Sequence, residues 1–251
     1  MKIPEFSDRK KNVTKVKMEK EGGKMDFETY KDELNLIYWQ NDCELDLYHL
    51  VGEILRYSEP MKKLSLRDVS ARRHSPMGEV FYGLSGFPDL VILDTKFKNS
   101  EDKWEKFDNE NQMYGAVEIK SLRTPLYDVE DILNRAQGIK ERQKTITNEE
   151  WILLGECIWY RKLIYTNGKD WKFVECGYSD EERKNICEIV KKQITGKLGL
   201  WVDAMDFKKI EFCRSETILK EENFNQSGWN QLIAFLNSIQ WNQNQPEAQT
   251  K

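Results

Sequence analysis

"GLSGFPDLVILD", residues 83–94, contains an apolar run that is typical of a buried strand and that begins directly after a carboxylate. A charged group at the start of a buried strand is unexpected, and it points to the fold. The apolar run Leu90–Leu93 puts apolar side chains on both faces of a strand, since side chains alternate along it. Such a run is typical of a central strand that is covered on both sides. Pro88 offers no backbone donor and belongs at the end of the strand. Asp89 follows it, and its carboxylate is costly to bury unless something binds it.

A second stretch, "YGAVEIKSL" at 114–122, contains the same conflict. Glu118 and Lys120 are two residues apart and project to one face of the predicted strand. If the two strands are neighbours, Asp89 and Glu118 converge on one hard cation such as Mg²⁺, with the carbonyl of Ile119 as a further ligand. A neighbouring cation and burial would lower the pKa of Lys120, so that its amine orients or deprotonates an attacking water. These groups are the equipment of metal-assisted phosphodiester hydrolysis.

The remaining pattern predicts one α/β domain with a central mixed β-sheet flanked by helices. We expect a flexible charged arm over 1–25, the folded domain over 26–241 and a polar tail over 242–251. No internal repeat or linker divides the chain. A helix should follow a cap at Asn41 or Asp42 and end before Pro60. The other elements are expected as strands near 64–69, 81–94 (bent near Gly83 and Gly86), 115–122, 162–168, 170–176 and within 200–212, and as helices near 26–38, 128–144, 149–160, 179–195 and from a cap at Ser227.

The arrangement Pro88-Asp89 … Glu118-Ile119-Lys120, on successive strands after an acid-bearing helix, resembles the PD-(D/E)xK nuclease superfamily. "GLSGFPDLVILD", "YGAVEIKSL" and "KLIYTNGKDWKF", in that order, are similar to restriction-type members. These include the N-terminal nuclease regions of type I restriction subunits and small stand-alone relatives. The resemblance covers roughly residues 41–175. It implies a restriction-endonuclease-like core, with Asp89 and Glu118 binding Mg²⁺ or Mn²⁺ and Lys120 assisting the attacking water.

The resemblance also implies an acid on the first helix of the core. Glu44 borders the apolar face of that helix, whereas Glu53 lies well off it, so we favour Glu44 and keep Glu53 as the alternative. Many members carry a glutamine on the helix after the lysine. Gln137 and Gln143 are the candidates, and the sequence does not choose between them.

Nucleic-acid binding would have to come from a local basic patch, because the formal net charge is −4. The stretch "KKLSLRDVSARRH" precedes the Pro-Asp strand and supplies five candidate phosphate contacts. They are Lys62, Lys63, Arg67, Arg72 and Arg73. A solvated face is the alternative interpretation of these charges. The next candidates lie on the helix that carries Arg135, Lys140 and Arg142.

Composition excludes several other classes. The five cysteines are scattered, which favours reduced thiols and a cytoplasmic location, and the start of the chain has no apolar signal core. No apolar run has the length of a membrane span. His49 and His74 are the two histidines, so a zinc site or a histidine-based triad is not expected. The aromatic residues Trp151, Trp159, Tyr160, Trp171 and Phe173 are expected in the core rather than in a base-stacking surface.

The predicted function is therefore a metal-dependent endonuclease, acting on DNA in restriction or phage defence. Two other functions remain open. One is a nuclease-fold module that binds nucleic acid or a partner without turnover. The other is an RNA nuclease, because the metal chemistry at phosphate is the same. A homodimer or a separately encoded partner subunit fits the cutting of a duplex, which takes two active sites or two visits.

Overall fold

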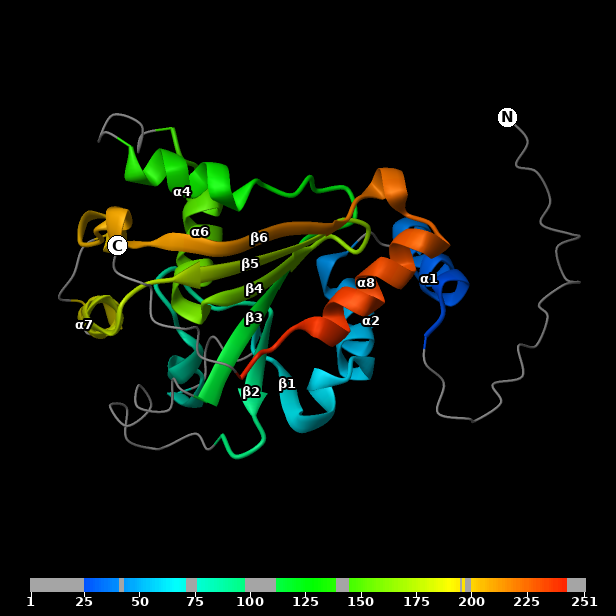
Figure 1. Cartoon of the computed structure of the whole chain (residues 1–251), viewed down its shortest axis with the longest axis horizontal. Coiled ribbons are helices and arrows are strands. Elements are labelled where there is room, and N and C mark those ends of the chain that lie inside the picture. The colour runs from blue at the N-terminus through cyan, green and yellow to red at the C-terminus, as the bar shows by residue number, and fades with distance from the viewer. Residues whose placement is uncertain are drawn as a thin grey trace, which may run out of the picture.

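The computed structural model describes residues 25–40, 43–70, 76–97, 112–138, 145–194, 196 and 200–242. Six strands form one sheet in chain order, which Figure 1 shows between two groups of helices. The strands are β1 (Leu64–Asp68), β2 (Leu90–Asp94), β3 (Met113–Ile119), β4 (Lys162–Thr166), β5 (Trp171–Gly177) and β6 (Glu211–Leu219).

The sheet is mixed. Neighbouring strands are antiparallel throughout, except that β3 and β4 run parallel. A parallel pair needs a long crossover, and here two helices between β3 and β4 provide it. They are α4 (Val129–Gln137) and α6 (Asn148–Tyr160). Because β3 and β4 are parallel, their carboxyl ends reach the same edge of the sheet.

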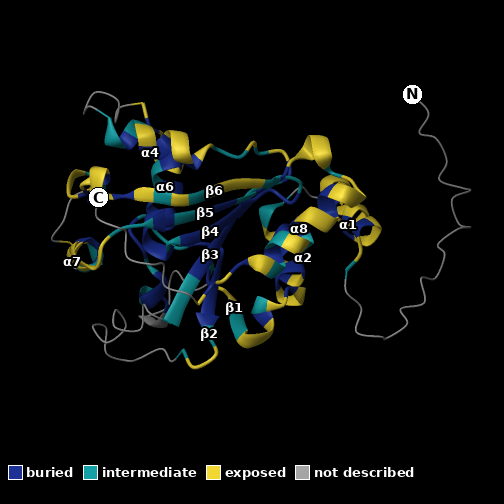
Figure 2. Ribbon diagram, in the orientation of Figure 1, coloured by how far each residue is buried: buried dark blue, intermediate teal, exposed yellow. Residues whose placement is uncertain are grey.

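Helices cover both faces of the sheet and bury a separate apolar core on each. One core contains Val91 and Leu93 of β2 with residues of α4, α6 and α7, and the other contains Leu90 and Ile92 with residues of α1, α2 and α8. Figure 2 shows β2, β3 and β4 and the inner faces of the helices as largely buried, whereas β6 carries exposed residues. The other α-helices in the described part of the chain are α1 (Phe27–Gln40), α2 (Glu44–Tyr57), α7 (Asp180–Ile194) and α8 (Gln226–Ser238). The expected single α/β domain is confirmed. The strand region expected at 81–94 is strand only over β2, because Phe81 ends a 3-10 helix and bends and coil follow it up to Asp89.

Short 3-10 helices fill several of the connections. They are η1 (Pro60–Lys63), η3 (Pro76–Phe81), η5 (Trp201–Asp203), η6 (Phe207–Lys209) and η7 (Glu221–Asn223). The strand expected within 200–212 is therefore wrong for most of that range, since β6 begins only at Glu211. The aromatic and polar residues before it pack as two helical turns instead.

Two helix caps differ from those expected. The N-cap of α2 is Cys43, without a side-chain hydrogen bond, while Asn41 and Asp42 lie outside the described residues. The N-cap of α8 is Asn225 rather than Ser227, because the Asn225 side chain accepts from the amides of Ser227 and Gly228. The expected arm at 1–25 and tail at 242–251 fall, apart from their innermost residues, outside the described part of the chain.

Four of the five aromatic residues expected in the core are buried: Trp159, Tyr160, Trp171 and Phe173. Trp151 is half-buried and packs against Trp201 and Phe207. All five cysteines are free thiols. None of the helices in the described ranges combines the length and the apolar character needed to cross a membrane.

Candidate active site

Asp89 and Glu118 lie opposite each other at one end of the sheet. β2 and β3 are antiparallel neighbours with Leu90 paired to Val117, so the same register places Asp89 opposite Glu118. Asp89 is 3% exposed and Glu118 is 6% exposed. The expectation that the two strands are neighbours is confirmed, and two buried carboxylates meet where they end.

The carboxylate of Asp89 is held by two donors. The hydroxyl of Tyr48 donates to Oδ1, and the amide of Ile119 donates to Oδ2 at 2.7 Å. These bonds fix the carboxylate between α2 and β3. Burial, followed by the negative charge of Glu118, nevertheless raises the pKa of Asp89 to about 8. The fold therefore keeps a carboxyl group at a position that disfavours its charged form.

Glu44 is the acid of α2 that faces Asp89. The hydroxyl of Tyr48 lies 3.3 Å from Glu44 Oε1, and the charge of Glu44 contributes to raising the pKa of both Tyr48 and Asp89. Glu53 is exposed, and its nearest described partner is the Tyr57 hydroxyl at 3.5 Å. The structure thus brings Glu44 to the cluster and leaves Glu53 on the outer side of the helix.

Lys120 pairs with Glu118 across 2.6 Å from Nζ to Oε1. Burial disfavours its ammonium form, but Glu118, with smaller contributions from Glu44 and Asp89, outweighs that effect and raises the pKa of Lys120. The sequence expectation was a lowered pKa caused partly by a neighbouring cation. The protein groups alone produce the opposite shift, so Lys120 is an ammonium donor among the acids.

Glu156 of α6 is a site residue that the sequence analysis missed. It is 2% exposed, hydrogen-bonds Glu118, and its Oε2 is buried without a hydrogen-bond partner among the described residues. Burial, followed by the charges of Glu118 and Asp89, raises the pKa of Glu156 well above its ordinary value. Its surroundings therefore favour the neutral carboxyl form of Glu156. The signal was present in the sequence, because Glu156 is the one charged residue of the apolar run at 151–160.

The helix α6 is close to the loop that leads to Asp89. A Cβ added at Gly155 would lie 2.5 Å from the Ser85 hydroxyl oxygen, so glycine permits this approach. The Ser85 hydroxyl also donates to the carbonyl of Ile152 at 2.7 Å. This packing fixes Glu156 relative to the Pro-Asp loop.

The "TNG…W" element supports the position of Lys120. The amide of Lys120 donates to the carbonyl of Thr166, the last residue of β4, at 2.8 Å. Gly168 has a φ of 89° in the following turn, and its carbonyl accepts from the Trp171 ring N–H at 3.1 Å. The predicted turn at Asn167-Gly168 is confirmed, and it closes the loop at the same edge of the sheet as the acids.

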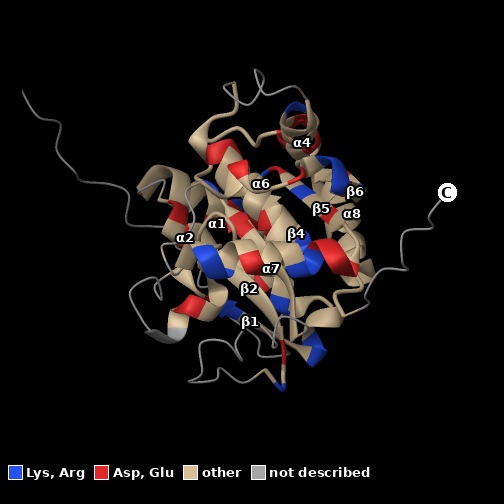
Figure 3. Cartoon of the chain, turned by 90° about the vertical axis from the view of Figure 1, so that its left-hand side faces the viewer, with Lys and Arg blue, Asp and Glu red and all other residues tan. Residues whose placement is uncertain are grey.

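The expected phosphate contacts are only partly near the site. β1 pairs Asp68 with Leu90 and Leu64 with Asp94, so Lys62 and Lys63 lie at the end of β1 that is farther from Asp89. Arg67 is exposed near the acid end. Arg72 and Arg73 lie outside the described residues, as do Lys140 and Arg142. Figure 3 shows basic and acidic residues interspersed on the face that carries α4, α6 and α7.

The glutamine candidates do not join the site in the described structure. The side-chain amide of Gln137 donates to the carbonyls of Phe207 and Ile210, at 3.1 and 2.7 Å. It therefore fastens α4 to the segment before β6. Gln143 lies outside the described residues. Arg135 of the same helix pairs with Asp131 and Glu150, which makes it a structural residue.

The chemistry of the cluster fits a hard divalent cation, although the side chains are not in ligand positions as they stand. Within the described ranges, no three histidine, cysteine or acidic side chains are grouped so that they could hold one ion. Asp89 and Glu118 offer oxygen donors, which Mg²⁺ prefers, and the Ile119 peptide already contacts Asp89. The buried and unpartnered Oε2 of Glu156 is a further oxygen at this place. Lys120 holds Glu118 Oε1, so a cation that binds through this oxygen would displace the ammonium.

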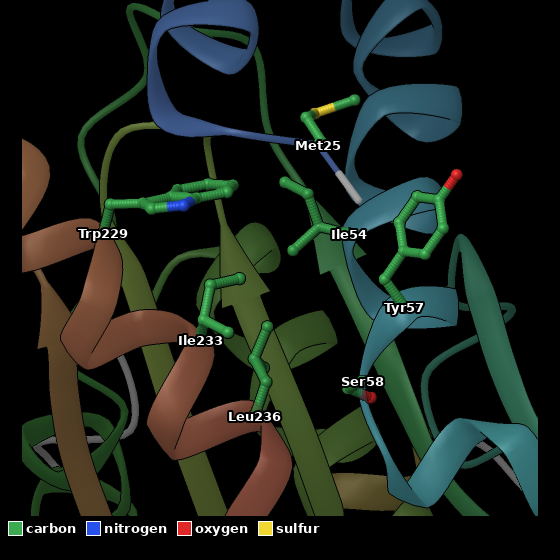
Figure 4. Close-up of a pocket in the computed structure, with 7 residues that line it drawn as sticks. All are labelled: Met25, Ile54, Tyr57, Ser58, Trp229, Ile233 and Leu236. Atoms are coloured by element: carbon green, nitrogen blue, oxygen red, sulfur yellow. The ribbon is translucent and has the colours of Figure 1, made fainter. Parts of the chain in front are cut away.

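A hollow of about 260 Å³ lies elsewhere, between the C-terminal half of α2 and α8 (Figure 4). Its walls are mainly apolar. They are formed by Met25, Ile54, Tyr57, Ser58, Trp229, Ile233 and Leu236. The Ser58 hydroxyl is already bonded to the carbonyl of Leu55. The acids lie at the other end of α2, so this hollow is separate from the candidate site.

Comparisons with protein-family models, curated proteins and solved structures find no match for this chain. We call Glu44, Asp89, Glu118 and Glu156, together with Lys120, the acid cluster.

Proposed function

We propose that the protein is a metal-dependent endonuclease of the PD-(D/E)xK type that hydrolyses phosphodiester bonds of DNA, in restriction or phage defence. One observation carries the proposal. Asp89 and Glu118 are buried opposite each other at the ends of two central strands, and Lys120 is 2.6 Å from Glu118. Grouping like charges in a buried place costs stability, and such clusters are found preferentially at functional sites.

Each member of the cluster has a role in this proposal. Asp89, Glu118 and the Ile119 carbonyl would hold Mg²⁺ or Mn²⁺, which supplies Lewis-acid stabilisation and a water of lowered pKa. Tyr48 and the Ile119 amide keep the Asp89 carboxylate in one orientation. Lys120 carries the positive charge that faces the phosphate or orients the attacking water.

Two alternatives differ in what the chain would do with nucleic acid. A binding module without turnover would have no need of Lys120 within the acid cluster, and this favours the enzyme. An RNA nuclease would use the same acids. The acids therefore do not distinguish DNA from RNA, and a cleavage assay with both substrates does. The free cysteines are consistent with the proposed cytoplasmic setting. A homodimer or a partner subunit would supply the second cut of a duplex.

The test is incubation of the purified chain with supercoiled plasmid, single-stranded DNA and RNA, each with Mg²⁺, Mn²⁺ or a chelator. We expect strand cleavage that requires the metal. Asp89→Asn should lower its rate by at least about a thousandfold, because a charged ligand is lost. Asp94→Asn is the matched control, since Asp94 ends the same strand away from the cluster, and it should cut at the wild-type rate.

Two results would overturn the proposal. The first is that no substrate is cut with either metal, which together with tight DNA binding would favour the binding module. The second is that Asp89→Asn cuts as fast as the wild-type chain, which would place any activity elsewhere.

A further inference from the structure

An unusual group of exposed aromatic side chains lies at the junction of α1 and α2. Trp39 is 80% exposed and Tyr38 is 36% exposed, at the last turn of α1. Their rings meet edge to face with centroids 5.2 Å apart. The guanidinium carbon of Arg123, which is also exposed, lies 4.4 Å from the centre of the Tyr38 ring. The cation thus holds the Tyr38 ring, and Tyr38 in turn supports Trp39.

Two more exposed apolar residues extend this surface. Leu36 precedes Trp39 by one helical turn and is 47% exposed, and Leu45, the second residue of α2, is 60% exposed. Among the described residues, four of the six large apolar side chains recorded as exposed therefore gather at this junction. Soluble proteins use such patches mostly for binding.

The junction is anchored to the loop that follows Lys120. A Cβ at Gly168 would lie within 3.3 Å of side chains from α1, α2 and this loop, namely Leu34, Leu47 and Leu122. The Tyr30 hydroxyl of α1 donates to the Gly168 carbonyl. The Asn167 side chain donates to the carbonyl of Thr124 at 2.9 Å. The aromatic group is therefore held in place relative to the site.

The same group is also close to the acid cluster along the chain. Trp39 precedes Glu44 by five residues, and Arg123 follows Lys120 by three. Fully extended chain of these lengths spans at most about 18 and about 11 Å. The aromatic group and the acid cluster therefore both lie within the span of one strand of a few nucleotides.

We propose that Trp39, Tyr38 and Arg123 form a stacking platform for the bases of single-stranded nucleic acid next to the acid cluster. The proposal rests on the proposed function and gives it a substrate class, a strand with unpaired bases. Aromatic rings beside arginine are the groups on which successive bases stack, and every base offers a π-face to them. Arg123 adds a positive charge beside these rings, which suits a polyanionic strand.

The experiment measures binding rather than cleavage, in Ca²⁺, with the full chain and labelled oligonucleotides. The probes are one single-stranded DNA, the RNA of the same sequence, the corresponding duplex and an abasic DNA strand that keeps all phosphates. We expect Trp39→Ala to weaken binding to the base-bearing single strands by about tenfold, within the range of one lost base stack. Binding to the abasic strand should be unchanged, and Trp39→Phe should keep most of the affinity.

Leu200→Ala is the matched control. Leu200 is 69% exposed but lies before η5, in the helical layer that contains α7. Its truncation should change none of the four affinities. A loss confined to DNA or to RNA would define which of the two single strands the platform holds.

Three results would overturn the platform. The first is equal binding of base-bearing strands by the wild-type chain and Trp39→Ala. The second is an equal loss on the abasic strand. The third is a change of oligomeric state in Trp39→Ala without any loss of strand binding, which would make this surface an interface between copies. If strand binding depends on Trp39 while no metal supports cleavage, the platform stands and the endonuclease fails.

Discussion

At the two ends of the central strands, side chains of the same kind have their pKa shifted in opposite directions. Asp89 directly precedes strand β2, and Asp94 is its last residue. Burial and the charge of Glu118 raise the pKa of Asp89 to about 8, whereas the amide of Lys96 and the hydroxyl of Tyr114 lower the pKa of Asp94. Asp94 is thus an ordinary carboxylate with donors of its own. Asp89 has donors too, yet it is placed among other acids.

Two lysines, Lys162, which is buried, and Lys120, which is half-buried, repeat the contrast. Lys162, at the start of β4 and far from the acids, has its pKa lowered by burial, which Glu175 only partly offsets. Lys120, at the acid end, has its pKa raised because the surrounding carboxylates outweigh its burial. One end of the sheet therefore satisfies its charges locally, and the other concentrates negative charge around one ammonium. The acid end therefore places like charges together at a cost in stability, and this is the feature on which the proposed metal site depends.

The largest difference in cleavage rate between the two ends is expected for their lysines. Lys120→Ala should lower the rate of metal-dependent cleavage by about 10²- to 10³-fold, the usual cost of removing one preorganised donor that stabilises charge in the transition state. Lys162→Met should leave the rate per folded molecule unchanged and reduce stability, because Glu175 and the Gln240 carbonyl lose their partner. The measurements are initial rates on one substrate and denaturant unfolding of both variants. Equal rates for Lys120→Ala and Lys162→Met would remove the functional distinction between the two ends.

The next effect concerns Glu156, whose carboxyl group contacts Glu118 from α6. Glu156→Ala should slow cleavage by about 10- to 100-fold, the usual cost of losing a group that orients a metal ligand. Glu156→Gln should recover much of that loss, because a neutral amide can still donate to Glu118. Single-turnover rates against Mg²⁺ concentration separate lost affinity from lost chemistry.

Glu150→Ala provides the control for this helix. Glu150 pairs with Arg135 and closes the capping box of α6, so its loss should lower stability and leave the rate unchanged. If Glu156→Ala behaves like Glu150→Ala, Glu156 belongs to the packing of α6 and not to the site.

Much of the acid end was predictable from the sequence, and the reasons are local. Asp89, Glu118 and Lys120 each interrupt or border an apolar strand. The two-residue spacing of Glu118 and Lys120 places their side chains on the same face. The same reasoning would have found Glu156 in its apolar helix, had that helix been searched for misplaced charges. Strand direction is not local, however. Lys62 and Lys63 were expected near the site, but β1 runs toward the acids and places its preceding residues at the other end.

Exposure at the α1–α2 junction was also beyond the sequence pattern. Trp39 and Tyr38 end a helix whose apolar periodicity is weak, so the pattern could not decide which side faces solvent. The packing of Tyr30 and Leu34 against the Gly168 turn makes that choice. Such packing joins residues more than 100 positions apart, and one sequence does not specify it.

A smaller effect separates the two acids of α2. Glu44→Gln should slow cleavage by about tenfold, since its charge acts on Asp89 and on Lys120 across the cluster. Glu53→Gln should change the rate less than twofold, because Glu53 is exposed and faces Tyr57. Both variants keep the helix and its shape, so each serves as the control of the other. The reverse order of effects would move the helix acid to Glu53 and contradict the geometry.

The smallest effect is a difference in stability between Asp89→Asn and Asp94→Asn, measured in the presence of a chelator. The pKa of folded Asp89, about 8, lies above the ordinary value of 3.8, so the folded chain binds more protons than the unfolded chain between these values. The free energy of unfolding should therefore fall as the pH rises from about 4 to about 8. Asp89→Asn removes that dependence, and its amide can still accept from Ile119 and donate to Tyr48. We expect this variant to be more stable than wild type at pH 8 by about 1 kcal/mol or more, with the gain vanishing toward pH 4.

Asp94 has a lowered pKa, so its contribution to stability is present at neutral pH and is lost as the pH falls. Asp94→Asn should accordingly be less stable than wild type at pH 8, and the two should approach each other in acid. Urea unfolding of the three chains at several pH values decides the matter. If Asp89→Asn is less stable than wild type at every pH, the Asp89 carboxylate is a structural acceptor for Tyr48 and Ile119, and the two ends of β2 do not differ in kind.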